Sequence, residues 1–263
     1  MIKGVKLYLF DMDGTLYLGD RLFSFTKDLL KRIKEDGHRY MFMTNNSSKS
    51  VEAYINKLMK LGIESRKSDF ITSSMATIHY IKENYIDKTF YVCGTTSLID
   101  EFTDAGIKIT SVYSEAEAIV MGYDTELTYK KLEDVCKILL SRDVPYIATN
   151  PDYVCPTEYG SVPDCGSVCD MIYNATGKRP YFIGKPSPLM PELAMKIANA
   201  TPKETAVIGD RIYTDVKSGI NAGTVSVLVM SGETDEQILK ESKDKPDIVL
   251  SDAGEIIKGE IIR

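Results

Sequence analysis

The sequence predicts an α/β fold, in which a second α/β unit is inserted into an open parallel sheet. Three observations lead to this class. Short apolar segments alternate with amphipathic ones, acidic or amide residues follow several apolar segments, and a turn-rich stretch interrupts the middle of the chain. Strands that alternate with helices are joined by right-handed crossovers and therefore form a parallel sheet. We thus expect a sheet core with polar side chains gathered at one edge.

The first part of this core, residues 1–74, is predicted to contribute three strands and two helices. Val5–Phe10 is short and almost wholly apolar, as expected for a strand that is buried on both faces. The spacing of apolar residues predicts a helix over Thr26–Asp36. Tyr40–Met43 is the next strand, a second amphipathic helix follows it, and Phe70–Ile71 is a third, short strand.

The last part, residues 181–263, repeats the alternation. It is predicted to form a helix at Leu189–Ala198 and strands at Thr205–Asp210, Val225–Val229 and Asp247–Leu250, with helical segments between the strands. Residues 75–180 have elements of their own. Strands are expected at Thr89–Cys93, Ala118–Met121 and Pro145–Ala148, and helices near Leu98–Thr103, Tyr129–Leu140 and Ser167–Ala175. We therefore predict a core of residues 1–74 plus 181–263 and an inserted domain of residues 75–180.

The composition limits the partners of this 263-residue chain. A formal charge of −6 and a pI near 5.2 argue against nucleic acid or an anionic membrane as the main partner. The sequence has no apolar run long enough to span a membrane and no visible signal peptide, so the cytoplasm is the expected location. The five cysteines include no CxxC pair, which favours reduced thiols over a zinc site. The oligomeric state stays open, with a homodimer as one option.

Polar residues follow the predicted core strands. In chain order they are Asp11 and Asp13, then Thr44, Asn45 and Asn46, then Asp210, with Asp215 five residues further on. Lys185, in the stretch "GKPSP", precedes the helix that begins at Leu189. In open parallel sheets, ligands bind outside the carboxyl ends of the strands. We therefore expect these side chains to form one site.

The chemistry of these residues indicates a metal and an anion. Several carboxylates at one edge repel one another unless a cation lies among them. Oxygen ligands of this kind suit Mg²⁺, which keeps several waters and binds one or two carboxylates together with phosphate oxygen. Thr44 and Lys185 are suitable donors to an anion, and Gly14 lets the backbone turn so that amide N–H groups can point toward it. The pattern predicts a Mg²⁺ site that handles a phosphate group.

Four short stretches resemble a known family. "DMDGT", "TNNSS", "GKPSP" and "GDRIYTD" are similar, in that order, to the four motifs of the haloacid dehalogenase (HAD) superfamily. The wording of "TNNSS" and "ATNPD", and an insert between the second and third motifs, resemble its NagD-type, 4-nitrophenylphosphatase branch. The resemblance implies a Rossmann-like parallel core (the HAD fold) with an inserted α/β cap. It is weaker in the insert, where family members often read Gly-Ala-Gly and this chain reads "DCG" at Asp164–Gly166.

The resemblance also implies catalytic roles. Asp11 would attack phosphorus and carry the phosphoryl group as an aspartyl-phosphate. Asp13 would protonate the leaving oxygen and then activate the water that hydrolyses this intermediate. The metal ligands that the family pattern implies are Asp11, the main-chain carbonyl of Asp13 and Asp210, with Asp215 either a direct ligand or a supporting residue beside them.

Substrate binding is expected to be divided between core and cap. Thr44, Asn45 and Lys185 would hold the phosphoryl group, with Asn46 beside them. The cap would close over the site and select the substrate. Within it, Asn150 and Asp152 are candidates for contacts to the leaving group, although the Asn-Pro-Asp sequence could equally make a simple turn.

Asp13 bears on the type of reaction. The ATPase pumps of this superfamily carry "DKTGT", with threonine at the position of Asp13, which suits a long-lived phospho-intermediate. An aspartate there favours a phosphatase that hydrolyses a sugar phosphate, a nucleotide or a similar small phosphate ester. Two alternatives stay open, namely a phosphotransferase or mutase, and a phospho-acceptor signalling protein with the same Asp and Mg²⁺ chemistry. A non-catalytic binding protein on the same fold is less consistent with the complete set of motifs.

Overall fold

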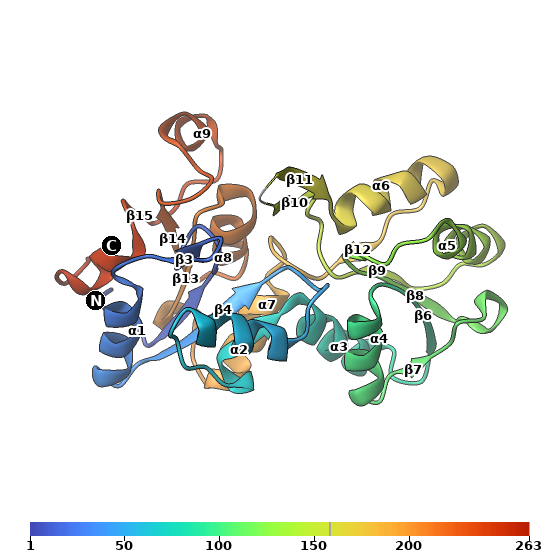
Figure 1. Ribbon diagram of the computed structural model, residues 1–263, viewed down its shortest axis with the longest axis horizontal. Coiled ribbons are helices and arrows are strands. Elements are labelled where there is room, and N and C mark those ends of the chain that lie inside the picture. Colours follow the sequence, from blue (N-terminus) through green and yellow to red (C-terminus); the bar gives the residue numbers. More distant parts are fainter. Residues whose placement is uncertain (158, 263) are drawn as a thin grey trace. The chain divides into compact units, whose positions relative to one another are not determined.

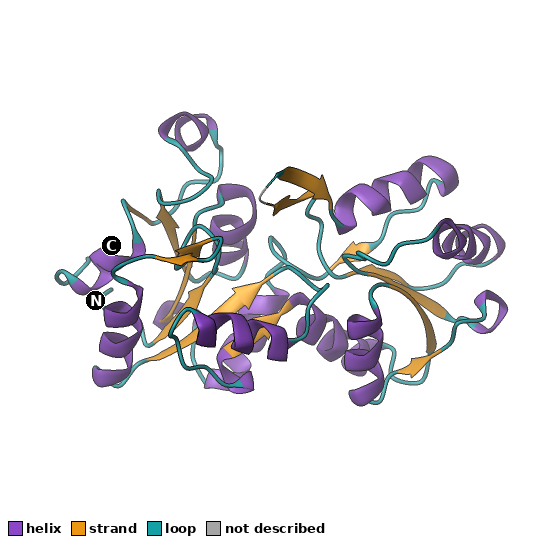
Figure 2. Cartoon of the chain, viewed as in Figure 1, coloured by secondary structure: helices purple, strands orange, loops and turns teal. Residues whose placement is uncertain are grey.

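The computed structural model describes residues 1–157 and 159–262, which form two compact units (Figure 1). Unit 1 contains Met1–Thr44, Val51–Ile71 and the chain from Lys185 onward, and unit 2 contains Asn45–Ser50 and Thr72–Gly184. In each unit, helices flank a sheet (Figure 2). The predicted fold class, an α/β protein with a parallel sheet core, is confirmed. The predicted assignment of residues 75–180 to a specificity domain stays a prediction, because packing alone defines the two units.

The sheet of unit 1 has six strands in the order β15-β14-β13-β1-β4-β5. Along the chain they are β1 (Leu7–Phe10), β4 (Arg39–Thr44), β5 (Phe70–Thr72), β13 (Thr205–Gly209), β14 (Val225–Val229) and β15 (Ile248–Leu250). β1 is parallel to both of its neighbours, with Phe10 opposite Phe42 of β4 and Ile208 of β13. All four residues of β1 are buried, which explains the apolar run in the sequence.

The strand order of unit 1 reverses between β1 and β13. From β1 the chain adds β4 and β5 on one side, and β13, β14 and β15 lie on the other side. This reversal is the topological switch point of a doubly wound sheet, where the loops that leave the strands diverge and make room for a ligand. The residues that follow β1 and β13 therefore flank the expected binding position.

Among the described residues, five helices accompany this sheet. They are α1 (Thr26–Glu35), α2 (Val51–Lys60), α7 (Leu189–Ala198), α8 (Lys217–Asn221) and α9 (Glu236–Glu241). α1 illustrates why amphipathic spacing predicts a helix, because Leu29, Leu30 and Ile33 share its buried face. Three features of unit 1 were not predicted from the sequence. They are the hairpin of β2 (Tyr17–Leu18) and β3 (Arg21–Leu22), a π-helix at Ile212–Val216 and three 3₁₀ turns at Lys67–Asp69, Pro202–Glu204 and Ala253–Ile257.

Unit 2 contains a five-stranded sheet of order β12-β9-β8-β6-β7, in which every pair is parallel. Its strands are β6 (Thr89–Cys93), β7 (Lys108–Ile109), β8 (Ala118–Met121), β9 (Tyr146–Ala148) and β12 (Tyr181–Phe182). The helices are α3 (Ser73–Asn84), α4 (Thr96–Asp104), α5 (Tyr129–Ser141) and α6 (Cys165–Thr176), and a 3₁₀ turn spans Tyr113–Glu115. The turn-rich stretch forms an antiparallel hairpin of β10 (Val154–Thr157) and β11 (Gly160–Pro163).

Two expectations from composition can be compared with this structure. Within residues 1–157 and 159–262, no helix combines the length and the apolar character needed to cross a membrane. All five cysteines are free thiols, and the Sγ atoms of Cys165 and Cys169 lie 4.0 Å apart in the core of unit 2.

Candidate active site

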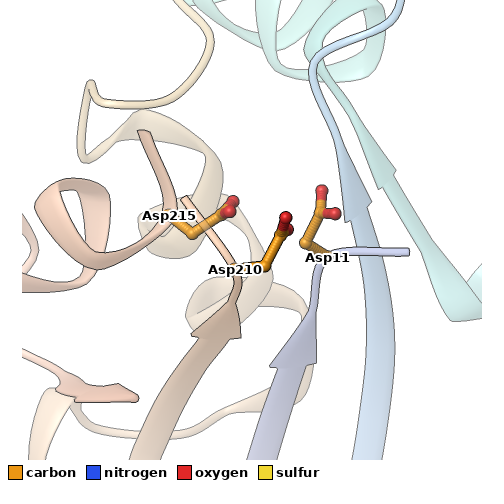
Figure 3. Close-up of side chains that lie close together, drawn as sticks. All are labelled: Asp11, Asp210 and Asp215. Carbon is orange, nitrogen blue, oxygen red and sulfur yellow. The ribbon is translucent and has the colours of Figure 1, made fainter. Parts of the chain in front are cut away.

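Three aspartates meet at the switch point of unit 1. Asp11 directly follows β1, Asp210 directly follows β13, and Asp215 lies within the π-helix Ile212–Val216 (Figure 3). One carboxylate oxygen from each lies within 4.8 Å of those of the other two. Asp210 and Asp215 are buried, whereas Asp11 is partly exposed. Three acids are therefore held together although their charges repel.

Lys185 lies among these aspartates. Its Nζ donates to Asp11 Oδ1 at 2.7 Å, to Asp215 Oδ1 at 2.6 Å and to the main-chain oxygen of Met43 at 3.3 Å. Burial opposes the charge on this ammonium, but Asp11 and Asp215 outweigh burial and raise the pKa of Lys185 above its usual range. Lys185 is therefore charged, and it neutralises only one of the three carboxylates.

The pKa values of the two buried aspartates reflect the negative charge that Lys185 does not neutralise. Burial raises the pKa of Asp210 to about 7, and the charges of Asp11 and Asp215 add to this effect. Burial also raises the pKa of Asp215 to about 6, although the Lys185 ammonium opposes the shift. Strongly shifted acids at a strand end are typical of functional sites.

The geometry around Asp210 fits a hard cation. Its Oδ2 accepts the N–H of Glu233 at 2.7 Å, whereas its buried Oδ1 has no hydrogen-bond partner among the described residues. Gly14 has a φ of +84°, and a Cβ there would lie 2.5 Å from Asp210 Oδ2, so only glycine leaves this space open. The donors are oxygens alone, which suits Mg²⁺. Asp11, Asp210 and Asp215 are thus the residues that could hold the metal.

Asp13 occupies a different position from the three clustered acids. It is exposed, and its Oδ1 accepts the N–H of Gly19, from the β2–β3 hairpin, at 3.3 Å. Although the residue reaches solvent, desolvation by the surrounding protein raises the pKa of Asp13, while Gly19 and Lys57 oppose the shift. Its carboxylate does not belong to the three-aspartate cluster. A metal contact from Asp13 would therefore involve its main-chain carbonyl, as the sequence pattern implied.

The "TNNSS" stretch is divided between the two units. Thr44 ends β4 in unit 1 and is largely buried. Asn45 and Asn46 belong to unit 2, where Asn45 Nδ2 donates to Asp152 Oδ2 at 3.1 Å and Asn46 Oδ1 accepts the N–H of Ser48 at 2.9 Å. The structure therefore joins Asn45 to Asp152, a contact between residues that the sequence had assigned to separate domains.

Asn150 and Asp152 are also close together in unit 2. Asn150 Nδ2 donates to Asp152 Oδ2 at 3.2 Å and to Asp164 Oδ1 at 3.1 Å, and Asn150 is fully buried. Asp164 caps the N-terminus of α6 by accepting the N–H of Cys165. A leaving-group contact for Asn150 and Asp152 stays a prediction.

Sequence reasoning missed the ion pair beside the three aspartates. Arg211 Nε lies 2.8 Å from Glu233 Oε2, and the main-chain N–H groups of both residues donate to the acids: Arg211 to Asp215 and Glu233 to Asp210. Arg211 stands inside "GDRIYTD" and could have been noticed there. Glu233 lies 23 residues after Asp210, and nothing in its local sequence indicates that it packs beside the site.

Comparison with known proteins agrees with this geometry. A haloacid dehalogenase-like hydrolase family model matches residues 8–108, and a HAD-hydrolase-like model matches residues 182–256. An acid sugar phosphatase of Staphylococcus haemolyticus is 32% identical over 93% of this chain and 92% of its own length. The 5'-nucleotidase YutF of Bacillus subtilis is 33% identical, over 93% of this chain and 94% of its own.

Solved structures give the same result. The 4-nitrophenylphosphatase of Thermotoga maritima superposes with a TM-score of 0.92 at 36% identity, covering 97% of both chains. NagD from E. coli K-12 superposes with a TM-score of 0.88 at 27% identity, covering 95% of this chain and 98% of its own. This chain belongs to the haloacid dehalogenase-like hydrolases. Its predicted resemblance to the NagD and 4-nitrophenylphosphatase branch and its predicted enzyme class, HAD-type phosphatase, are both confirmed.

Proposed function

We propose that this protein hydrolyses a small phosphate monoester with Mg²⁺, through an aspartyl-phosphate on Asp11. The observation that carries the proposal is the cluster of Asp11, Asp210 and Asp215 with one charged lysine at the switch point of the sheet. Relatives of similar length bear the names acid sugar phosphatase and 5'-nucleotidase. We infer a substrate of that kind, a sugar phosphate, a nucleotide or a similar metabolite.

Asp11 is the proposed nucleophile. It is the most exposed of the three clustered acids, and it stands at the end of the central strand β1. Its attack on phosphorus is opposed by the negative charge of the ester, so cationic groups have to cancel that charge. Lys185 lies within hydrogen-bond distance of Asp11 and is suited to contact the transferring phosphoryl group together with Thr44 and Asn45. Asn46, which follows Asn45 in the loop after β4, is proposed to assist in binding the phosphoryl group.

Asp11, Asp210, Asp215 and the Asp13 carbonyl would hold the metal. When bound, Mg²⁺ would supply positive charge that stabilises the phosphoryl group and the acids around it. This assignment is supported by the unsatisfied Asp210 Oδ1 and by the surplus negative charge that Lys185 leaves.

Asp13 is the proposed general acid and base. An aspartate of ordinary pKa is almost entirely ionised at neutral pH and is a poor acid. Desolvation raises the pKa of Asp13, which moves it toward the range where it can donate a proton to the leaving oxygen. Asp13 lies outside the metal cluster, so its carboxyl group stays available for proton transfer.

The experiment that tests the function is phosphate release from a panel of phosphate esters. Sugar phosphates, nucleoside monophosphates and nitrophenyl phosphate should be assayed with and without added Mg²⁺. We expect Mg²⁺-dependent release from at least one class of metabolite. Transfer of the phosphoryl group to an added alcohol or sugar in preference to water would instead favour the phosphotransferase or mutase alternative. The proposed specificity role of residues 75–180, the cytoplasmic location and a homodimer stay predictions.

Replacing Asp13 with asparagine should slow the hydrolysis of esters with poor leaving groups more than that of esters with good ones. Loss of a general acid typically lowers rates by about 10²- to 10⁴-fold, and an alkoxide leaving group depends on protonation far more than nitrophenolate does. We expect a large loss of kcat/KM for an alkyl phosphate and a clearly smaller one for nitrophenyl phosphate. Asp28→Asn, an exposed position on α1, is the matched control. Equal slowing of both esters would contradict the role of Asp13 as the acid.

Mg²⁺ should stabilise the fold more at about pH 8 than at about pH 5.5. The pKa of Asp210 and that of Asp215 are raised in the folded state, so protonation favours folding. For the metal-free protein, this contribution is greatest at low pH and is lost as the pH rises through about 6 to 7, where the carboxylates ionise and repel. Asp11, Asp210 and Asp215 would repel one another less with Mg²⁺ bound between them. The measurement is the Mg²⁺-induced rise in melting temperature at both pH values, and an equal rise would contradict the account.

A further inference from the structure

A polar cluster in unit 2, of which all members but one are buried, lies where the chain passes between the two units. We call it the junction cluster and define it as Asn45, Ser73, Thr149, Asn150 and Asp152. Asn45 Nδ2 donates to Asp152 Oδ2 at 3.1 Å, and Ser73 Oγ donates to the main-chain oxygen of Asn45 at 2.6 Å. All of these residues belong to unit 2. The cluster therefore fixes Asn45 at both its side chain and its main chain.

Asn150 is the centre of the junction cluster. Its Nδ2 donates to Asp152 and Asp164, and its Oδ1 accepts the Thr149 hydroxyl at 3.0 Å. Its exposed fraction is 0%, so its amide group is used inside the protein rather than presented to solvent. A polar side chain that is buried and hydrogen-bonded on both its nitrogen and its oxygen is suited to holding its neighbours in place. This is difficult to reconcile with a direct contact to a leaving group.

Three chain crossings meet at the junction cluster. The chain passes between the units at Thr44–Asn45, at Ile71–Thr72 and at Gly184–Lys185, and once more at Ser50–Val51. At the first crossing, Asn45 is itself a cluster member, and at the second the cluster member Ser73 follows Thr72. At the third, the N–H of Gly184 donates to the main-chain oxygen of the cluster member Thr149 at 2.8 Å. A Cβ at Gly184 would lie 2.6 Å from both Asn45 Oδ1 and the Thr149 oxygen. The packing at this junction is therefore tight enough to determine the path of the chain.

Two residues proposed for the chemistry adjoin this region of the chain, one next to the cluster member Asn45 and one next to Gly184, whose N–H donates to the cluster member Thr149. Thr44 precedes Asn45, and Lys185 follows Gly184. We propose that the junction cluster is a positioning network: Asn150 and Asp152 fix Asn45 and Gly184, and through them the proposed phosphate-binding residues Thr44 and Lys185. This inference rests on the proposed function and deepens it, because residues of the insert then support the chemistry common to all substrates.

The proposal predicts a uniform loss of activity. A displacement of about 1 Å in a positioning group can lower a rate by roughly 100-fold. Asn150→Ala removes the hydrogen bonds to Asp152, Asp164 and Thr149 together, so we expect a loss of about that size in kcat/KM. The loss should be the same for a larger metabolite ester and for acetyl phosphate, whose leaving group is only a small acetate. Asn150→Asp, which keeps the shape but loses the N–H donors, should behave similarly.

Ser73→Ala provides a second, milder variant in case Asn150→Ala does not fold. It removes one hydroxyl that donates to Asn45, and its uniform loss should be smaller. Asn174→Ala, at an exposed position on α6, is the matched control and should leave kcat/KM unchanged. The experiment measures kcat/KM on both esters, the melting temperature, and the Kd for inorganic phosphate with Mg²⁺ by calorimetry.

The outcomes separate the positioning role from its alternatives. Equal losses on both esters, with weaker phosphate binding, are the predicted result. If acetyl phosphate is hydrolysed normally while the larger ester is not, Asn150 contacts the leaving group and the proposal is wrong. If only the melting temperature falls, the cluster is merely structural and the proposal is again wrong. If the wild-type protein hydrolyses no ester, the proposed function fails, but phosphate binding by wild type and variants still decides the inference.

Discussion

Replacing Asp11 with asparagine is expected to lower the steady-state rate of phosphate release by about 10⁴-fold or more, because removal of a nucleophile has effects of this size. The asparagine amide has nearly the same shape as the carboxylate but cannot attack phosphorus. The fold should persist, since Asp11 contributes to the repulsion that raises the pKa of Asp210 and of Asp215. Without metal, the variant should melt at the same temperature as the wild type or slightly higher.

The measurement combines kinetics with a melting curve. Asp28→Asn carries the same chemical change on an exposed face of α1 and serves as the control. A rate for Asp11→Asn close to that of the wild type would show that another group attacks the ester. A large fall in melting temperature would mean that the loss of activity has a structural cause, and the variant could not then support the assignment of Asp11.

Removal of the metal should abolish phosphate release, and added Mg²⁺ should restore it. Lys185 is the one ammonium in contact with Asp11 and Asp215 among the described residues, and it cannot neutralise three carboxylates and a phosphate ester together. The protein should be treated with EDTA, dialysed and assayed before and after addition of Mg²⁺. EDTA saturated with Mg²⁺ beforehand is the control for effects of the chelator itself. Full activity in excess EDTA would exclude a hydrolytic role for the metal.

Most strands of unit 1, and the polar residues that follow them, could be predicted because both are visible in short stretches of sequence. Val5–Phe10 had to be a buried strand, and Asp11 had to follow it. The prediction that Asp11 and Asp210 meet required only that parallel strands present their carboxyl ends at one edge. Lys185 does not follow a core strand, and it was placed at the site from its position in "GKPSP" before the helix that begins at Leu189. Strand bounds differ by a few residues, for example in β1, which begins at Leu7 rather than Val5, because the sequence pattern does not reveal where pairing begins.

Other features depend on contacts between distant parts of the chain and could not be predicted. Asn45 packs in unit 2 because its side chain donates a hydrogen bond to Asp152, which lies 107 residues further along the chain. The burial of Asn150 likewise depends on its hydrogen bond to Asp164, which caps the N-terminus of α6. Apolar spacing cannot distinguish a π-helix from an α-helix over five residues, so the geometry that turns Asp215 toward Asp11 was not foreseen.

The central claim is that Asp11 carries the phosphoryl group during turnover, and chemical trapping tests it most directly. The enzyme should be mixed with substrate and Mg²⁺, quenched in acid within one turnover and treated with borohydride, which reduces an acyl phosphate to an alcohol. Peptide mass spectrometry then locates the modified residue. We expect homoserine in place of Asp11, and we expect none in Asp11→Asn or in samples without substrate. Reduction at another residue, or no trapped residue during rapid turnover of a labelled ester, would contradict it.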